Sequence, residues 1–598
     1  MRLTIPLLLA AATAACSIVT PPPAPPAAAP KAAPAGAPAK AAPPAPARPA
    51  QATRAKAARP GPPPKAPEPE AARGLDPDLL YRLMLAEIAG QRGELKVAVD
   101  NYVEAARLSR DPRVAERATR IAVYARDDAA ALEVARLWAE LEPDNVEARQ
   151  VAAAMLVRRG DVAGALAQLE KVVELRSGER AYQLITSLLS KEKNKDTALA
   201  VMEALVARRA DDAQALYAYA QLASFMGEQA RAAEAVDRAL ALKPGWTPAV
   251  ILKSSILARQ KDTAGSLALL ESALEERPDD TDLRLYYARR LVDERRLREA
   301  RAQFLRVLES SPDNTDALYA VGLLSVELND TDTAVRQFER LVKTGRRVAE
   351  SSFFLGQIEE TRKNYDRALM WYRVVRSGQY WLDAQIRTAV VYFRQGDLER
   401  ARAHLHNIEP NSAGMEVRLR LAESDLLREA DRLQEAFDVL TDALGDMPHN
   451  KELLYARALV AEKLDRLDVT EADLRAILER EPDNAQALNA LGYTLADRSD
   501  RLDEALQYIE RAYKLRPDDP AIIDSMGWVH YRLGNYEEAL KYLTRAFELM
   551  NDPEIAAHLG EVLWVTGDRD GAREVWNKAV SKSPDHRALQ DVIRRFTE

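Results

Sequence analysis

The chain has 598 residues, of which 47% are hydrophobic and 29% charged, and its formal net charge is −8. This balance provides ample apolar surface for burial and excludes disorder for most of the chain. The single cysteine, Cys16, excludes an internal disulfide and a thiolate metal cluster within one chain.

The first fifteen residues have the pattern of a secretory signal peptide. A basic second residue precedes an apolar run over residues 3–15, which is shorter than the roughly 20 helical residues needed to cross a bilayer. The run Thr13-Ala14-Ala15-Cys16 resembles a bacterial lipoprotein signal. This resemblance implies cleavage before Cys16, lipidation of that cysteine and, because Ser17 follows it, an outer-membrane location facing the periplasm. An ordinary secretory peptide or an uncleaved anchor is the alternative interpretation.

Residues 16–73 combine this cysteine with a Pro/Ala-rich linker. From residue 20 onward the segment has no core-forming residues, so we expect a semi-rigid tether that reaches up to roughly 170 Å at about 3.1 Å per residue. Its eight Lys and Arg against two acidic residues give it a net charge of +6. These cations either contact an anionic surface or merely keep the segment soluble.

The charge of the remaining chain argues against nucleic acid as a partner. The whole chain carries −8, and the linker with Arg2 accounts for +7, so residues 74–598 carry −15. An acidic array of this kind repels a phosphate backbone.

A small residue recurs about every 34 positions from residue 98 to residue 572. Spacings of 33 to 35 residues over fifteen units indicate a solenoid of repeated helical hairpins. The positions are Ala98, Ala131, Ala165, Ala198, Ala232, Ser266, Ala300, Ala334, Ala368, Ala401, Ala436, Thr470, Ala505, Ala539 and Ala572.

Breaker residues flank this ladder at fixed offsets. Proline follows many of the small residues by twelve positions, as at Pro143 and Pro517, where it marks the exit from a second helix. Glycine precedes several of them by five positions, where its tolerance of a positive φ ends a first helix. These glycines are Gly93, Gly160, Gly227, Gly396, Gly534 and Gly567, with Asn329 in the same slot. The pattern predicts an all-α protein of helix, tight turn and helix.

This pattern resembles the tetratricopeptide repeat, most closely over residues 519–552 and 553–584. Gly527 occupies the close approach of the two helices there, Gly534 the turn, and Ala539 the inward face of the second helix. The resemblance implies a right-handed superhelix of about fifteen helix-turn-helix repeats over residues 74–585. We expect residues 586–598 to form a C-terminal capping helix, and a break in the array near residues 410–414.

The same resemblance predicts where a partner binds. In this family the first helices line a concave groove, and contacts come from the second, fifth, ninth and twelfth positions of each unit. Aromatic residues are rigid contact surfaces that dominate binding energy, and the alternative is that they pack between neighbouring first helices. The predicted protein-binding residues are Tyr455, Tyr493, Trp528, Tyr531 and Trp564.

We find no pattern that indicates catalysis, a cofactor or a metal. The six histidines lack the HExxH spacing, and His404 and His406 are two residues apart on a predicted helix, so we expect both to be solvated. Phosphate-binding glycine loops and the GxSxG turn are also missing from the sequence. The sequence therefore predicts a protein that is not an enzyme.

The final units, the lipoprotein-like start and the tether together suggest a cellular role. The segments Asp524-Ser525-Met526-Gly527-Trp528 and 556–564 look like those of the tetratricopeptide lipoproteins that act as adaptors for carboxyl-terminal processing proteases. This resemblance implies a scaffold that binds and activates the protease and presents substrates such as cell-wall hydrolases. The alternative is a scaffold for outer-membrane assembly or exopolysaccharide secretion.

Overall fold

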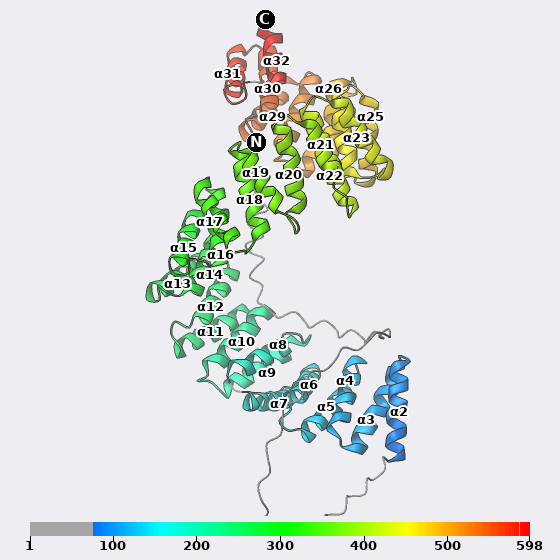
Figure 1. Cartoon of the computed structure of the whole chain (residues 1–598), viewed down its shortest axis with the longest axis vertical. Coiled ribbons are helices and arrows are strands. Elements are labelled where there is room, and N and C mark those ends of the chain that lie inside the picture. Colours follow the sequence, from blue (N-terminus) through cyan, green and yellow to red (C-terminus); the bar gives the residue numbers. More distant parts are fainter. Residues whose placement is uncertain (1–75, 177, 585, 598) are drawn as a thin grey trace, which may run out of the picture. The chain divides into compact units, whose positions relative to one another are not determined.

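The computed structural model describes residues 76–597 except 177 and 585, and all regular structure in this part of the chain is α-helical (Figure 1). The thirty-one helices that it contains are numbered α2 to α32. The all-α prediction is therefore confirmed. The predicted signal peptide, Cys16 and the whole of the linker lie outside the described residues.

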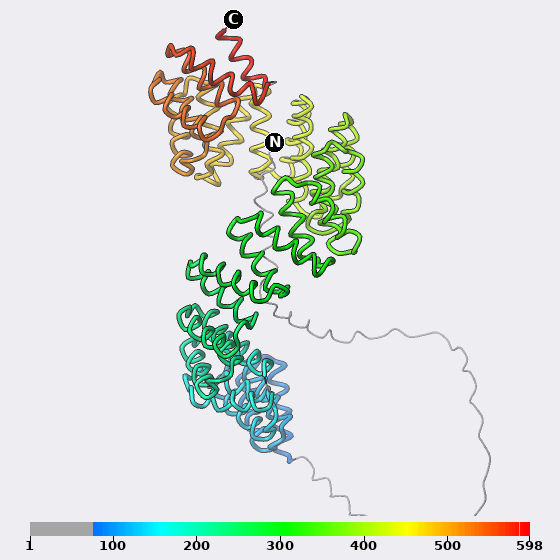
Figure 2. The backbone as a smooth tube through the Cα atoms, turned by 90° about the vertical axis from the view of Figure 1, so that its left-hand side faces the viewer, coloured from blue at the N-terminus to red at the C-terminus, as the bar shows by residue number. Residues whose placement is uncertain are grey.

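The chain divides into two compact units, which meet between Leu328 and Asn329. In the first unit, consecutive helices form hairpins that stack in chain order (Figure 2). Its helices are α2 (Pro77–Gln91), α3 (Leu95–Ser109), α4 (Pro112–Tyr124), α5 (Asp128–Leu141), α6 (Val146–Arg158), α7 (Val162–Leu175), α8 (Glu179–Leu189), α9 (Lys195–Ala207), α10 (Ala213–Met226), α11 (Gln229–Leu242), α12 (Thr247–Arg259), α13 (Thr263–Glu276), α14 (Thr281–Asp293), α15 (Leu297–Ser310) and α16 (Thr315–Glu327).

The second unit has the same hairpin organisation from α18 to α31. Its helices are α17 (Thr331–Lys343), α18 (Val348–Thr361), α19 (Tyr365–Val374), α20 (Trp381–Arg394), α21 (Leu398–His406), α22 (Ala413–Glu429), α23 (Leu433–Asp446), α24 (Lys451–Lys463), α25 (Leu467–Arg480), α26 (Ala485–Arg498), α27 (Leu502–Leu515), α28 (Pro520–Arg532), α29 (Tyr536–Leu549), α30 (Pro553–Val565), α31 (Arg569–Val580) and α32 (Arg587–Thr597). Even-numbered helices from α2 to α30 are called first helices below, and odd-numbered helices second helices.

The ladder of small residues lies where the helices of a hairpin meet. Each of the fifteen predicted positions is the fourth residue of a second helix, and each side chain is 0–1% exposed. At the best-matched unit, a Cβ atom on Gly527 of α28 would lie 2.5 Å from Cγ of Leu543 and 3.1 Å from the carbonyl oxygen of Ala539. The backbones therefore approach too closely for any larger residue at Gly527.

The turn of the hairpin imposes a positive φ on one slot, five residues before the small position. The six glycines and Asn329 that the sequence places in this slot all have positive φ. Six further residues adopt the same conformation there without being glycine or asparagine, which the sequence did not indicate. They are Arg126, Lys261, Arg295, Lys363, Asp431 and Asp465. The repeat geometry thus overrides an unfavourable local preference.

The expected break near residues 410–414 is wrong. Leu405 of α21 and both Met415 and Leu419 of α22 belong to one buried cluster, so apolar packing continues across this segment. Ser412 caps α22, since its hydroxyl accepts a hydrogen bond from the backbone N–H of Met415. The irregular stretch is only a longer connection, and the boundary between compact units falls at residues 328 and 329 instead.

The last helix, α32, contacts α30 and covers the end of the second unit. Leu589 is fully buried, and Val592, Ile593 and Phe596 pack against the same cluster, which includes Trp576. Apolar side chains at helical spacing therefore face the last hairpin, and charged residues such as Arg594 point outward.

The described residues contain neither a membrane-spanning helix nor a cluster of metal ligands. No helix there has both the length and the apolar character to span a membrane. Nor do three or more His, Cys, Asp or Glu side chains gather there in a way that would hold a metal ion.

Candidate protein-binding site in the C-terminal unit

Three neighbouring first helices, α26, α28 and α30, carry a network of aromatic and polar side chains. Gly492 and Gly527 face the second helices of their own hairpins, where an added Cβ would lie 2.5 Å from Ile509 and Leu543. Successive residues of an α-helix are turned by about 100°. The residues that follow these glycines, Tyr493 and Trp528, therefore turn toward the neighbouring first helices.

His558 of α30 is the centre of this network. Its Nδ1 lies 2.9 Å and 3.0 Å from the two carboxylate oxygens of Asp524 in α28. Its Nε2 lies 3.3 Å from the hydroxyl of Tyr493 in α26. The ring of Trp528 stacks on the imidazole at a centroid distance of 4.2 Å. One side chain thus connects three consecutive hairpins.

The surroundings favour the charged form of His558. Burial lowers its pKa, but the carboxylate of Asp524, together with those of Glu554 and Asp497, outweighs this effect, and the pKa is raised above its ordinary value. A protonated imidazole donates from both nitrogens, which matches the carboxylate on one side and the Tyr493 hydroxyl on the other. The side chains of His558 and Asp524 are 14% and 10% exposed, so the ion pair is largely shielded from water.

Carboxylates surround the network. Burial raises the pKa of Tyr493, and the negative charges of Asp497, Asp524, Glu554 and Glu462 raise it further. The Glu462 pKa is raised as well, mainly by burial and in part by Asp497 and Glu554. This part of the first-helix face is therefore acidic and complements a basic partner.

Trp528 is buried beneath the other side chains of the network. It is only 7% exposed, its Nε1 donates to Asp497 at 3.2 Å, and Tyr531 packs on it at 5.1 Å. The Tyr531 hydroxyl in turn donates to Glu561 at 3.1 Å. Burial, with a contribution from Glu561, raises the pKa of Tyr531 to about 12. Trp528 consequently supports the neighbouring side chains more than it offers a contact surface.

Trp564 packs elsewhere. Its ring lies 5.7 Å from Trp576 and 6.3 Å from Phe596, and the guanidinium groups of Arg569 and Arg573 each lie 5.2 Å from it. It therefore belongs to the packing of α30 against α31 and α32. Of the predicted aromatics, Tyr493, Trp528 and Tyr531 are brought together, while Trp564 is held at the end of the array.

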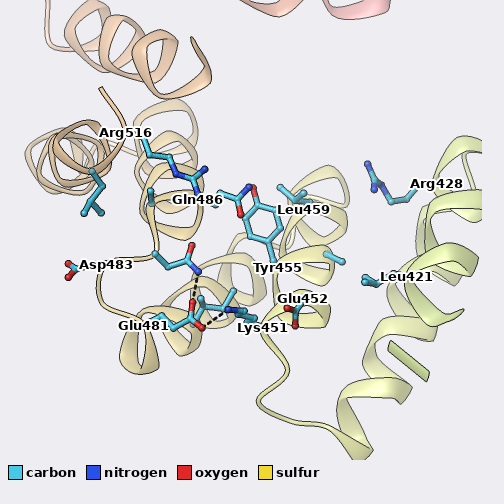
Figure 3. Close-up of a pocket in the computed structure, with 15 residues that line it drawn as sticks. Leu421, Arg428, Lys451, Glu452, Tyr455, Leu459, Glu481, Asp483, Gln486 and Arg516 are labelled. Carbon is cyan, nitrogen blue, oxygen red and sulfur yellow. Dashed lines mark hydrogen bonds and ion pairs between the residues drawn. The ribbon is translucent and has the colours of Figure 1, made fainter. Parts of the chain in front are cut away.

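Tyr455 lines a cleft of about 650 Å³ in the second unit (Figure 3). The cleft lies between α22, α24 and the connection into α26. Leu421 and Leu459 provide apolar walls, and an ion pair of 2.6 Å between Lys451 and Glu481 closes one side. A cleft of this size, with a tyrosine at its centre, fits a side chain or short segment of a partner.

The expectation that His404 and His406 are solvated is wrong for His404. Its ring packs edge-on against Tyr392 at 5.8 Å, and burial lowers its pKa. His406 is about half exposed and its Nε2 lies 2.8 Å from buried Glu423.

From the sequence, no individual role was predicted for His558 and Asp524. Their separation of 34 residues, one repeat period, is the signal that could have paired them.

Comparisons with known proteins agree with this architecture. Sequence models of the tetratricopeptide repeat match residues 257–324, 319–384, 455–520 and 521–553. A TPR repeat-containing protein of Pseudomonas aeruginosa is 37% identical over 497 residues, which cover 83% of this chain and 84% of that protein. The chain belongs to the tetratricopeptide-repeat (TPR) proteins.

More distant similarities were also found. Cellulose synthase operon protein C of Xanthomonas axonopodis is 25% identical over 394 residues, covering 55% of this TPR chain and 26% of that protein. The solved APC/C hetero-tetramer Cut9–Hcn1 contains a chain that is 16% identical, with 88% of this chain and 97% of that chain covered and a TM-score of 0.31. TPR arrays are scaffolds for protein–protein interaction, and this chain is one of them.

Proposed function

We propose that this TPR protein is a non-enzymatic adaptor, anchored to the outer membrane by a lipid on Cys16 and facing the periplasm. It binds and activates a carboxyl-terminal processing protease and presents substrates such as cell-wall hydrolases to it. The observation that carries the binding role is the first-helix face of the second unit, where the Tyr455 cleft and the acidic network of Tyr493 and His558 lie on one series of helices.

The chemistry of this face supports a protein partner. The cleft offers an aromatic ring between apolar walls, which suits an aliphatic or aromatic anchor side chain. The carboxylates of Glu462 and Glu554, whose charges act on Tyr493, suit a basic segment of the partner.

The N-terminal sequence supports the anchoring part of the proposal. A cysteine after a short apolar run suits lipidation, and the Pro/Ala-rich linker would let the array reach partners away from the membrane. The resemblance of the final units to adaptor lipoproteins supports the identity of the partner.

The test combines the purified protein with a carboxyl-terminal processing protease and a cell-wall hydrolase of the same organism. We expect faster cleavage of the hydrolase when the protein is present, and no cleavage of protein or peptidoglycan by the protein alone. Tyr455→Ala should weaken protease or substrate binding about 5- to 30-fold, since loss of an interface tyrosine costs roughly 1–2 kcal/mol. Tyr124→Ala, at a 73% exposed tyrosine of α4, is the matched control. Equal cleavage with and without the protein would refute the adaptor role.

A second candidate is a scaffold for outer-membrane assembly or exopolysaccharide secretion. The similarity to cellulose synthase operon protein C over 394 residues favours it. Crosslinked purification from envelope extract separates the two roles, because an assembly scaffold should capture outer-membrane or export components in place of a soluble protease.

A further inference from the structure

A second cleft, of about 310 Å³, opens on a different part of the C-terminal unit, between α19, α20 and α21. The two second helices that border it are the shortest helices of this unit, with 10 residues in α19 and 9 in α21. Residues 375–380 connect α19 to α20, and Val375 and Arg376 of this connection line the cleft.

One face of α20 forms the floor. Trp381, Gln385, Thr388 and Tyr392 all line the cleft, and their spacing of three or four residues places them on one side of the helix. Leu369 adds an apolar wall from α19. The floor thus combines two aromatic rings with an amide and a hydroxyl, a mixture that is typical of sites for small organic groups.

The charged groups at the rim are positive. Arg373 and Arg376 line the cleft and are exposed, and neither takes part in an ion pair among the described residues. The guanidinium of Arg400 lies over the Tyr392 ring at 4.1 Å. Burial and the nearby Arg400 lower the pKa of His404, which also lines the cleft, so its imidazole is neutral near pH 7 and donates one hydrogen bond.

The acidic residues of these three helices have other partners. Asp366 of α19 accepts a hydrogen bond from the side-chain amide of Gln395. Asp383 of α20 pairs with Arg418, and Glu399 of α21 pairs with Arg432. Asp397 accepts a hydrogen bond from the backbone N–H of Arg400 at the start of α21. The positive charge at the rim is therefore not balanced by these carboxylates.

We infer that this cleft binds a carboxylate carried on an apolar group of about the size of one amino-acid residue. Arg373 and Arg376 receive the carboxylate, because a guanidinium matches its geometry with paired N–H donors. The apolar group lies among Leu369, Trp381 and Tyr392. The carboxylate can belong to a free small molecule or to a polypeptide side chain. This assignment is independent of the protease-adaptor role.

The test uses isothermal titration calorimetry of the purified full-length protein with four probes. They are N-acetylphenylalanine, its amide, inorganic phosphate and an end-blocked peptide with one internal glutamate. Binding of the free acid, with at least tenfold weaker binding of the amide, is expected. Arg373→Gln and Arg376→Gln should each weaken the acid about 10- to 100-fold, the range for loss of a charge-assisted hydrogen bond. Arg587→Gln, at a solvent-exposed arginine of α32, should leave binding unchanged.

A spectroscopic readout locates the ligand. The free acid should change tryptophan fluorescence, and Trp381→Phe should abolish this change while calorimetric binding persists. Both arginines are exposed, so unchanged circular dichroism of their variants excludes misfolding as the cause of weaker binding.

The outcomes decide both the chemistry and the source of the ligand. Binding of the free acid alone assigns a small molecule, and equal binding of the blocked peptide assigns a polypeptide side chain. Equal binding of inorganic phosphate and the acid would overturn the inference in favour of an unselective anion site. Failure of both carboxylate probes at millimolar concentration, or equal binding by the arginine variants, would also overturn it.

Discussion

Removing the charge of Asp524 should weaken the C-terminal unit in a pH-dependent way. Asp524→Asn keeps the size of the side chain but leaves His558 without the carboxylate that raises its pKa. Breaking a fully buried ion pair costs about 3–5 kcal/mol. Because the two side chains keep 14% and 10% exposure, we expect a loss near the lower limit, about 3 kcal/mol, when His558 is charged.

The direction of the pH dependence follows from the raised pKa. A histidine whose pKa is higher in the folded than in the unfolded state adds stability that is fully present below the unfolded value of about 6.5. That stability is lost as the pH rises through the higher folded pKa. The difference between the wild type and Asp524→Asn should therefore be largest near pH 5.5 and smallest near pH 9.

Hydrogen exchange measured by mass spectrometry is the suitable assay, because a repeat array can open locally and a single melting temperature would average over many hairpins. Faster exchange in α28 and α30 of the variant, with a gap from wild type that narrows toward pH 9, is the expected result. Asp570→Asn, at a 99% exposed aspartate of α31, is the matched control. A gap that stays constant from pH 5.5 to 9 would show that His558 does not carry the charge.

Four further perturbations test the array and its anchor. Gly492→Ala should destabilise its hairpin by about 1–3 kcal/mol, since the new Cβ would lie 2.9 Å from a backbone oxygen, whereas Gly445→Ala, with open space around it, should be neutral or slightly stabilising in urea denaturation. Lys261→Gly should stabilise its hairpin by up to about 1 kcal/mol, because glycine relieves a φ of 66°, and slower hydrogen exchange there would show it. Deletion of residues 586–598 should expose the last hairpin, lower the melting temperature and promote association, and an unchanged monomer by light scattering would contradict this. Cys16→Ser should leave an unprocessed or soluble form, and wild-type membrane fractionation of the variant would count against lipid anchoring.

The repeat could be predicted from the sequence because its constraints are local and periodic. The small residue at the fourth position of each second helix is fixed by the contact between two backbones, so each unit repeats it. Where glycine occupies the turn, its residue type predicts the positive φ. Lys261 and Arg295 also have positive φ, but their residue types do not predict it. Tertiary packing decides the conformation at those positions.

The candidate site could be predicted only in outline. The repeat position of Tyr493, Trp528 and Tyr531 places them on neighbouring first helices, as the structure has them. It does not show which rings are accessible to a partner and which, like Trp528, are buried beneath their neighbours. Trp528 is covered by its neighbours, so Trp528→Ala would test folding more than binding. Trp564 does not join the other predicted aromatic residues. Its helix, α30, is followed by α32 in place of another hairpin, and Trp564 packs against Phe596 of α32. The Asp524–His558 pair joins two positions that are each unremarkable in sequence.

The central claim is that partners bind on the first-helix face of the second unit. The most direct measurement is photocrosslinking in cells, with a photoreactive amino acid placed at Tyr455 in the cleft or at Leu549, which is 53% exposed on the second helix α29. We predict that position 455 crosslinks to the protease or its substrates, identified by mass spectrometry, and that position 549 does not. Crosslinks from position 549 alone would contradict the assignment of this face as the binding surface.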